Sequence, residues 1–205
     1  PDDKYTAWHL DLQTAITQAA TPLQSLESII GRLSHASFVI PLSRHFLNPL
    51  RRHINRRRHP RQTIRLSAGD CADMRLWQTF LTTANRGISL NLITIRTPTQ
   101  MAWSDSCPFG LGGYTLAGTA WRIHIPPTSP IYGLDTANNI LEYIAMATSI
   151  LLLIHESSQT PFPCLLALGD NTSAISWIYR TSQLKPSSAY YNAANYISRT
   201  LASEA

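Results

Sequence analysis

The order of secondary-structure elements expected across residues 100–168 constrains the fold of this chain more than any other feature. Three short segments have strand-like composition and are separated by short glycine-containing turns: residues 100–105, 111–116 and 119–125. A long apolar helix is expected over residues 136–155, and a buried strand over 164–168 follows it. A strand, a crossover helix and a further strand place the last strand parallel to the first. The pattern predicts a mixed α/β sheet with an antiparallel meander, one parallel strand and flanking helices.

Three carboxylates lie in segments of this half that should otherwise be buried, namely Asp105, Glu142 and Asp170. An ionised carboxylate in apolar surroundings is costly unless a cation or dense hydrogen bonding compensates it. Asp105 and Asp170 are expected to end neighbouring parallel strands, at the edge where open α/β sheets place ligands. Glu142 lies in the first turns of the crossover helix, so it can reach the same edge. A shared divalent metal ion is the simplest partner for three such carboxylates.

Each of these acids also has a purely structural interpretation. Asp105 could be a turn residue, Glu142 a surface helix position, and Asp170 the N-cap of a helix that begins at Asn171. Glu142 fits its alternative least well, because it is a lone charge in a segment that is apolar nearly all round.

The composition describes a globular protein with an ample core, because 44% of the 205 residues are hydrophobic and 14% are charged. The three cysteines are far apart and lack the spacing of a zinc site, which favours a reducing, intracellular setting in the cytoplasm or nucleus. The longest uncharged apolar run, residues 143–154, is shorter than the roughly 20 residues of a membrane span, so no membrane association is expected. The chain begins at Pro1 and resembles a piece of a longer polypeptide.

Positive charge is concentrated in the first half of the chain. Residues 1–103 carry a net charge of +7 and residues 104–205 a net charge of −2, and no acid lies between Glu27 and Asp70. Arginine suits phosphate because its planar fork donates bidentate hydrogen bonds and stays charged. A solvated basic linker is the alternative. Six arginines of this acid-free stretch are candidates for binding nucleic acid: Arg51, Arg52, Arg56, Arg57, Arg58 and Arg61.

The first half is expected to be an all-α subdomain over residues 1–96. Thr21, Pro22 and Gln24 form a capping-box pattern that predicts a helix starting at Thr21 and ending before Pro41. Apolar spacing predicts a second helix over 42–54, kinked at Pro49, and a third over 70–85. The Met, Trp and Phe stripe of the third helix is expected to be core.

The second domain is expected to span residues 97–205. Beyond the buried strand, helices are predicted over residues 171–180 and 187–202.

Three motifs of the second half together resemble those of ribonuclease H domains, in the same order and at similar spacing. They are SDSCPFGLGGY, NNILEYIA and LGDNTSAISWI, which contain Asp105, Glu142 and Asp170 respectively. More narrowly, the chain resembles the ribonuclease H region that follows reverse transcriptase in DIRS-like, tyrosine-recombinase retrotransposons. In the first half, LQSLESIIGRLSHASFVIPLSRHFLNPLRRHI resembles the thumb helices of such polymerases, and IRLSAGDCADMRLWQTFLTTANRGISL resembles their connecting helix.

The resemblance implies a ribonuclease H-like fold and cleavage of the RNA strand of an RNA/DNA hybrid by two Mg²⁺ ions about 4 Å apart, for which Mn²⁺ could substitute. Asp105 would bridge both ions, and Glu142 and Asp170 would each hold one. Ser106 and Asn171 would contact the hybrid, although turn formation and helix initiation compete as their roles. The implied partners are the hybrid and an upstream polymerase region of the same polyprotein.

The chain departs from the family pattern at its C-terminus. Ribonuclease H domains of this kind carry a fourth acid in a motif after the last helix, and this chain has no matching motif. Glu204 is the only acid near this place, but the residues around it do not form the motif. We therefore expect a truncated domain whose three carboxylates bind one of two metal ions weakly. The alternatives are an inactive ribonuclease H-like remnant that binds nucleic acid as a scaffold, and a D-D-E integrase. The integrase is disfavoured because Glu142 precedes Asp170.

Overall fold

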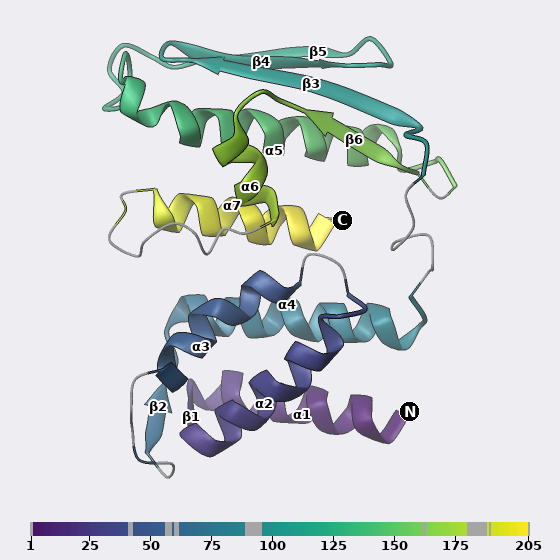
Figure 1. Ribbon diagram of the computed structural model, residues 1–205, viewed down its shortest axis with the longest axis vertical. Coiled ribbons are helices and arrows are strands. Elements are labelled where there is room, and N and C mark those ends of the chain that lie inside the picture. Colours follow the sequence, from purple (N-terminus) through teal and green to yellow (C-terminus); the bar gives the residue numbers. More distant parts are fainter. Residues whose placement is uncertain are drawn as a thin grey trace. The chain divides into compact units, whose positions relative to one another are not determined.

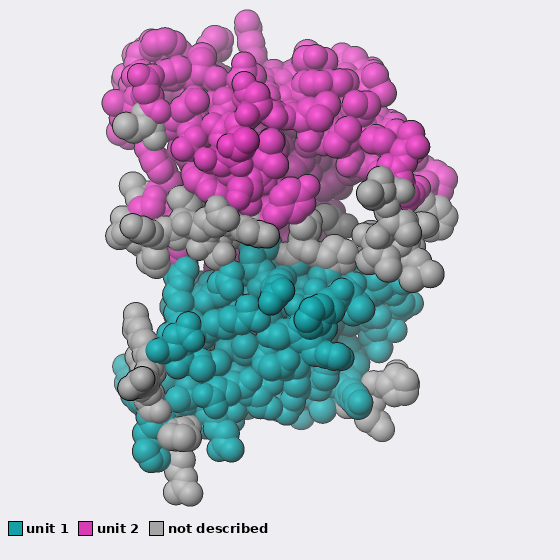
Figure 2. Space-filling view, viewed as in Figure 1, with its two compact units in different colours: residues 1–94 teal, residues 95–205 magenta. Residues whose placement is uncertain are grey.

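The chain divides into two compact units, residues 1–94 and 95–205, which Figure 2 shows in different colours. The computed structural model describes residues 2–40, 43–55, 59, 62–88, 96–161, 163–179, 188 and 190–204. Within these ranges the second unit is a mixed α/β domain, whereas the first is mainly helical.

The first unit contains four α-helices and two short strands among its described residues. They are α1 (Asp2–Gln18), β1 (Ala20–Pro22), α2 (Leu23–Ala36), the 3₁₀ turn η1 (Arg44–Leu47), α3 (Asn48–Asn55), β2 (Thr63–Arg65) and α4 (Ala68–Asn85). α1 packs against α4 and α2, and α3 packs against α2 (Figure 1). The core includes Met74 and Trp77 of α4, which are completely buried, so the prediction that this stripe is core is confirmed for these residues. Phe80 of the same stripe is only partly buried. α1 was not predicted.

Two predictions about this unit are wrong at the start of α2. Thr21 is not an N-cap residue: it lies in β1, where it pairs with Ile64 of the antiparallel strand β2. Because this pairing keeps the backbone extended as far as Pro22, α2 begins at Leu23 without a side-chain cap. The same pairing means that the unit is not all-α. Two strands of three residues each tie the α1–α2 junction to the segment before α4.

The single kinked helix predicted over residues 42–54 is also replaced by a different structure. Leu42 lies outside the described residues, and residues 44–55 form the 3₁₀ turn η1 followed by α3. Pro49 is the second residue of α3. At that position its missing backbone N–H leaves no helical hydrogen bond unmade, so proline begins a helix here and does not kink one.

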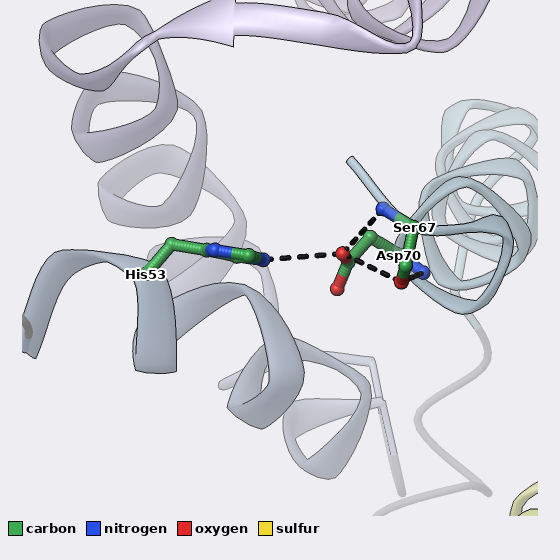
Figure 3. Close-up of polar contacts among 3 residues, drawn as sticks. All are labelled: His53, Ser67 and Asp70. Atoms are coloured by element: carbon green, nitrogen blue, oxygen red, sulfur yellow. Dashed lines mark hydrogen bonds and ion pairs between the residues drawn. The ribbon is translucent and has the colours of Figure 1, made fainter. Parts of the chain in front are cut away.

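α4 begins earlier than the predicted Asp70, because Ser67 caps it. The Ser67 hydroxyl accepts a hydrogen bond from the Asp70 backbone N–H at 3.1 Å, and the Ser67 backbone N–H donates to Asp70 Oδ2 at 2.9 Å. This reciprocal pair is a capping box. His53 Nε2 of α3 lies 3.1 Å from the same carboxylate oxygen, as Figure 3 shows. The three residues therefore join α3 to the start of α4.

The second unit contains a four-stranded mixed sheet, as predicted. Its described elements are β3 (Gln100–Cys107), β4 (Gly110–Thr115), β5 (Ala120–His124), the 3₁₀ turn η3 (Asp135–Ala137), α5 (Asn138–Glu156), β6 (Leu165–Leu168), α6 (Thr172–Tyr179) and α7 (Tyr191–Glu204). The strand order is β5-β4-β3-β6. β5, β4 and β3 form an antiparallel meander, and β6 is parallel to β3. Arg180, the last residue of one predicted helix, and Ser187, the first residue of the other, lie outside the described residues.

α5 is the central helix of this unit. It packs against β3, β4 and β6 on one side and against α6 and α7 on the other, so that it runs between the sheet and those helices (Figure 1). By length and composition α5 could cross a membrane, and it is the one helix among the described residues that could; half of it is buried inside the structure. The close packing of α5 on three strands is that of a core helix.

Candidate metal centre

Asp105, Glu142 and Asp170 come together at one edge of the sheet. One carboxylate oxygen of each lies within 4.8 Å of the others. The register explains the convergence of the two aspartates: Trp103 pairs with Leu168 at the end of the parallel ladder, and each aspartate lies two residues further along its chain. Glu142 is the fifth residue of α5 and is 5% exposed, whereas the two aspartates are exposed.

The three structural alternatives for these acids are wrong. Asp105 lies within β3 and pairs with Gly112, so it is not a turn residue. Glu142 is buried and is not on the surface. Asn171 caps α6, because its Oδ1 accepts a hydrogen bond from the Ala174 backbone N–H at 2.9 Å. Asp170 is therefore left without that role, and the cluster of acids needs another explanation.

Ser106 holds Glu142 in place. Its hydroxyl donates to Glu142 Oε1 at 2.9 Å, and its backbone N–H lies 3.2 Å from the same oxygen. That N–H also lies 2.8 Å from Asp105 Oδ1. Ser106 belongs to β3, so the turn-forming role considered for it is wrong. A residue that touches two of the three acids sets the spacing between them.

The electrostatics of the cluster favour a bound cation. Burial raises the pKa of the Glu142 carboxyl above its ordinary value, the hydrogen bonds from Ser106 lower it, and the nearby charges of Asp105 and Asp170 raise it further. The negative form of Glu142 is thus disfavoured both by desolvation and by like charges. A divalent cation between the three carboxylates would reverse both effects.

The donor set fits magnesium. All three ligands are carboxylate oxygens, which are the hard donors that Mg²⁺ and Mn²⁺ prefer. Two ligands of one Mg²⁺ lie at most about 4.2 Å apart, twice the usual Mg–O distance. Oxygens within 4.8 Å of one another need only small side-chain movements to reach one ion. Glu204 of α7 is exposed and is not part of the cluster.

Two asparagines that the sequence analysis did not single out lie beside the acids. Asn139 Oδ1 accepts a hydrogen bond from Asn171 Nδ2 at 2.9 Å, and the Ser106 hydroxyl lies 3.4 Å from Asn138 Oδ1. Both asparagines precede Glu142 by about one helical turn on α5, and this spacing could have indicated that they share its surroundings. Asn171 thus has two structural roles, as the cap of α6 and as a partner of Asn139.

The predicted nucleic-acid-binding arginines are only partly described. Arg51 and Arg52 lie in α3 of the first unit. Four others lie outside the described residues: Arg56, Arg57, Arg58 and Arg61.

No protein-family model, curated protein or solved structure matches this chain. The functional conclusion is therefore drawn from the sequence motifs and from the geometry of the carboxylate cluster.

Proposed function

We propose that the second unit is a ribonuclease H-like domain that hydrolyses the RNA strand of an RNA/DNA hybrid with Mg²⁺. The observation that carries this proposal is the convergence of Asp105, Glu142 and Asp170 within 4.8 Å at the carboxyl edge of a mixed sheet. Each acid lies in a segment that resembles a ribonuclease H motif. The order of the strands, an antiparallel meander followed by a crossover helix and a parallel strand, is compatible with that fold.

The chain's own residues would provide the metal ligands and their orientation. Asp105, Glu142 and Asp170 would hold the ions, which when bound supply an activated water and stabilise the leaving 3′ oxygen. Ser106 holds Glu142 Oε1 at 2.9 Å and so keeps that carboxylate directed at the two aspartates. Ser106 and Asn171 remain candidates for contacting the hybrid, because both lie beside the acids and both carry groups that can hydrogen-bond a 2′-hydroxyl.

The order of the acids favours this reaction over that of a D-D-E integrase. In this chain the glutamate lies on the crossover helix between β3, which carries Asp105, and β6, after which Asp170 follows. An integrase of that class places its glutamate on a helix after the second aspartate.

We also propose that the enzyme works inside the cell as part of a retrotransposon polyprotein, next to a polymerase region.

Cleavage of a labelled RNA/DNA hybrid by the full chain tests the proposal. We expect cleavage with Mg²⁺ or Mn²⁺ and a loss of at least about a hundredfold in Asp105→Asn and in Asp170→Asn, because losing a ligand should cost more than losing a residue that only orients one. Glu204→Gln is the matched control, since this exposed acid lies outside the cluster and should change nothing. Magnesium should also raise the melting temperature of the wild type but not that of Asp105→Asn.

The same measurements separate the enzyme from the scaffold alternative. Because the three carboxylates are expected to bind one of the two ions weakly, the test includes high concentrations of Mg²⁺ and Mn²⁺. A wild-type chain that binds the hybrid, and does not cut it at any concentration of either metal ion, is a nucleic-acid-binding scaffold. If magnesium raises the melting temperature of Asp105→Asn as much as that of the wild type, the three carboxylates are not the metal centre.

A further inference from the structure

Asp170 lies just beyond the end of the parallel ladder between β3 and β6. That ladder ends where Trp103 pairs with Leu168, and residues 169–171 then form a turn before α6 begins at Thr172. Among the described residues, one hydrogen bond that involves a side chain joins this turn to a different element. In that bond Asn171 Nδ2 donates to Asn139 Oδ1 of α5 at 2.9 Å. The residue next to Asp170 is thus tied to the helix that carries Glu142.

The hydrogen bonds of Asn171 fix which way both asparagine amides point. The Ala174 backbone N–H can only donate, and it lies 2.9 Å from Asn171 Oδ1. Because the oxygen of Asn171 accepts that bond, its amide nitrogen is the atom that faces α5, and Asn139 must present its own oxygen as the acceptor. Both ends of the Asn171 amide are therefore engaged, one with α6 and the other with α5.

Asn139 lies on the side of α5 that carries Glu142. The two residues are three positions apart in the helix, so their side chains share one face. The hydrogen bond from Asn171 to Asn139 therefore lies beside the cluster, whose carboxylate oxygens are within 4.8 Å of one another. Like charges at this distance repel, which favours a larger separation of Glu142 and Asp170. A link between α5 and the turn opposes that separation.

The packing of α6 on α5 also rests on contacts away from the turn. Trp177 of α6 is buried, and its ring lies edge-on to that of Tyr143 of α5, with ring centres 5.8 Å apart. Asn139, in contrast, is exposed. Truncating Asn139 should therefore leave α6 in place and loosen only the turn at its start. This separates the effect of the link on the acids from its effect on the fold.

We propose that Asn139, acting through Asn171, is a positioning residue that holds Asp170 close enough to Glu142 for the three carboxylates to share a divalent cation. The inference rests on the proposed function, because it takes the carboxylate cluster to be a Mg²⁺ site. It gives Asn139 a role in metal affinity and not in contact with the hybrid.

Binding of Mg²⁺ to the full chain without nucleic acid tests the proposal, measured by calorimetric titration and by the magnesium dependence of the melting temperature. We expect Asn139→Ala to weaken Mg²⁺ affinity by about tenfold, the lower end of the effect of groups that orient metal ligands. Asn171→Ser should do the same, because serine still caps α6 but is too short to reach Asn139. The double variant should also lose about tenfold, since both changes break one link.

Asn195→Ala is the matched control for these variants. Asn195 lies in α7, and its Nδ2 donates to the Tyr191 carbonyl oxygen of the same helix at 2.9 Å. Its truncation removes a hydrogen bond of similar length that does not involve the turn or α5. This variant should keep the wild-type affinity for Mg²⁺.

Cleavage of the hybrid distinguishes positioning from contact with the substrate. Asn139→Ala should lower kcat at limiting Mg²⁺ and recover most of it at saturating Mg²⁺, with an unchanged KM for the hybrid. A raised KM that saturating Mg²⁺ does not restore would make Asn139 a hybrid-binding residue and overturn the proposal.

The metal measurements decide the proposal even if the chain is not an active nuclease. Wild-type Mg²⁺ affinity in Asn139→Ala, or a loss in the double variant equal to the product of the two single losses, overturns the positioning role alone. The expected losses in a chain that never cleaves the hybrid support positioning and contradict only the proposed catalysis. If the wild type binds no Mg²⁺, both the metal centre and the positioning role are wrong.

Discussion

Glu142→Gln should stabilise the metal-free protein while abolishing its response to magnesium. The substitution keeps the shape of the side chain and leaves an oxygen that can accept the hydrogen bond from the Ser106 hydroxyl, which measures 2.9 Å. It removes a buried negative charge that faces Asp105 and Asp170. Because both desolvation and like-charge repulsion disfavour that charge, the free energy of unfolding should rise when it is removed.

The size of the gain follows from the separation of the carboxylates. Two unit charges about 4.8 Å apart repel by roughly 3.5 kcal/mol at an effective dielectric constant of about 20. Water and salt reduce this value, because Asp105 and Asp170 are exposed. We expect Glu142→Gln to gain about 1–2 kcal/mol in the free energy of unfolding at pH 7.5 without metal.

The gain should depend on pH. Because the pKa of Glu142 is raised on folding, the folded wild type binds this proton more tightly than the unfolded chain does. Its stability therefore falls as pH rises from the unfolded value, about 4.3, through the folded one. Glutamine does not titrate, so the advantage of Glu142→Gln should be near zero at pH 4 and largest above the folded pKa.

Urea denaturation of both proteins at pH 4 and pH 7.5, with EDTA or with Mg²⁺, measures these differences. Magnesium should stabilise the wild type and leave the variant unchanged. The difference in their free energies of unfolding should therefore shrink, or change sign, as the metal concentration rises. If Glu142→Gln is less stable than the wild type in EDTA at pH 7.5, or if its advantage is the same at pH 4, repulsion among the acids does not govern the stability of this cluster.

Two further substitutions test the packing that supports the units. Ser67→Ala should lower the free energy of unfolding by about 1 kcal/mol, because it removes the N-cap of α4 and a hydrogen bond to Asp70. Thermal or urea denaturation measures this change, and an unchanged stability would mean that the capping box contributes nothing. Gly113→Ala should cost about 1–3 kcal/mol, since the added carbon would lie 2.5 Å from the Trp103 carbonyl oxygen. Gly31→Ala is its control: no atom lies within 4 Å of the added carbon in the interior of α2, so this change should stabilise by up to about 1 kcal/mol, and equal effects at the two glycines would contradict the steric reasoning.

The elements of the second unit could be predicted because the signals for them are local. Short turns that contain glycine mark the meander, and the handedness and spacing of a crossover helix require β6 to lie parallel to β3. β1 and β2 could not be predicted in this way. They are three residues long, and the pairing of Thr21 with Ile64 joins positions far apart in the sequence. The local capping-box pattern predicted a helix start at Thr21, but the long-range pairing of β1 with β2 keeps Thr21 in a strand. A local pattern carries no information about such a pairing.

The acids of the candidate site could be predicted, but the groups that position them could not. Glu142 stood out as a charge in an apolar helix, and it is buried. The role of Ser106 depends on Glu142, 36 residues away, and on which face of β3 the hydroxyl occupies. Neighbouring residues in the sequence give no information about such a contact. The same holds for Asn139 and its hydrogen bond to Asn171.

The distance between Glu142 and Asp170 depends on how closely the end of β6 approaches α5, and a glycine permits that approach. Gly169 stands between the last residue of β6 and Asp170, and a carbon added there would lie 2.7 Å from Met146 Cε. Met146 is four residues after Glu142, so both side chains project from the same side of α5. A side chain at residue 169 must displace the flexible end of Met146, which is itself buried against this segment. The absence of a side chain at Gly169 therefore leaves room for Met146 beside the turn that carries Asp170.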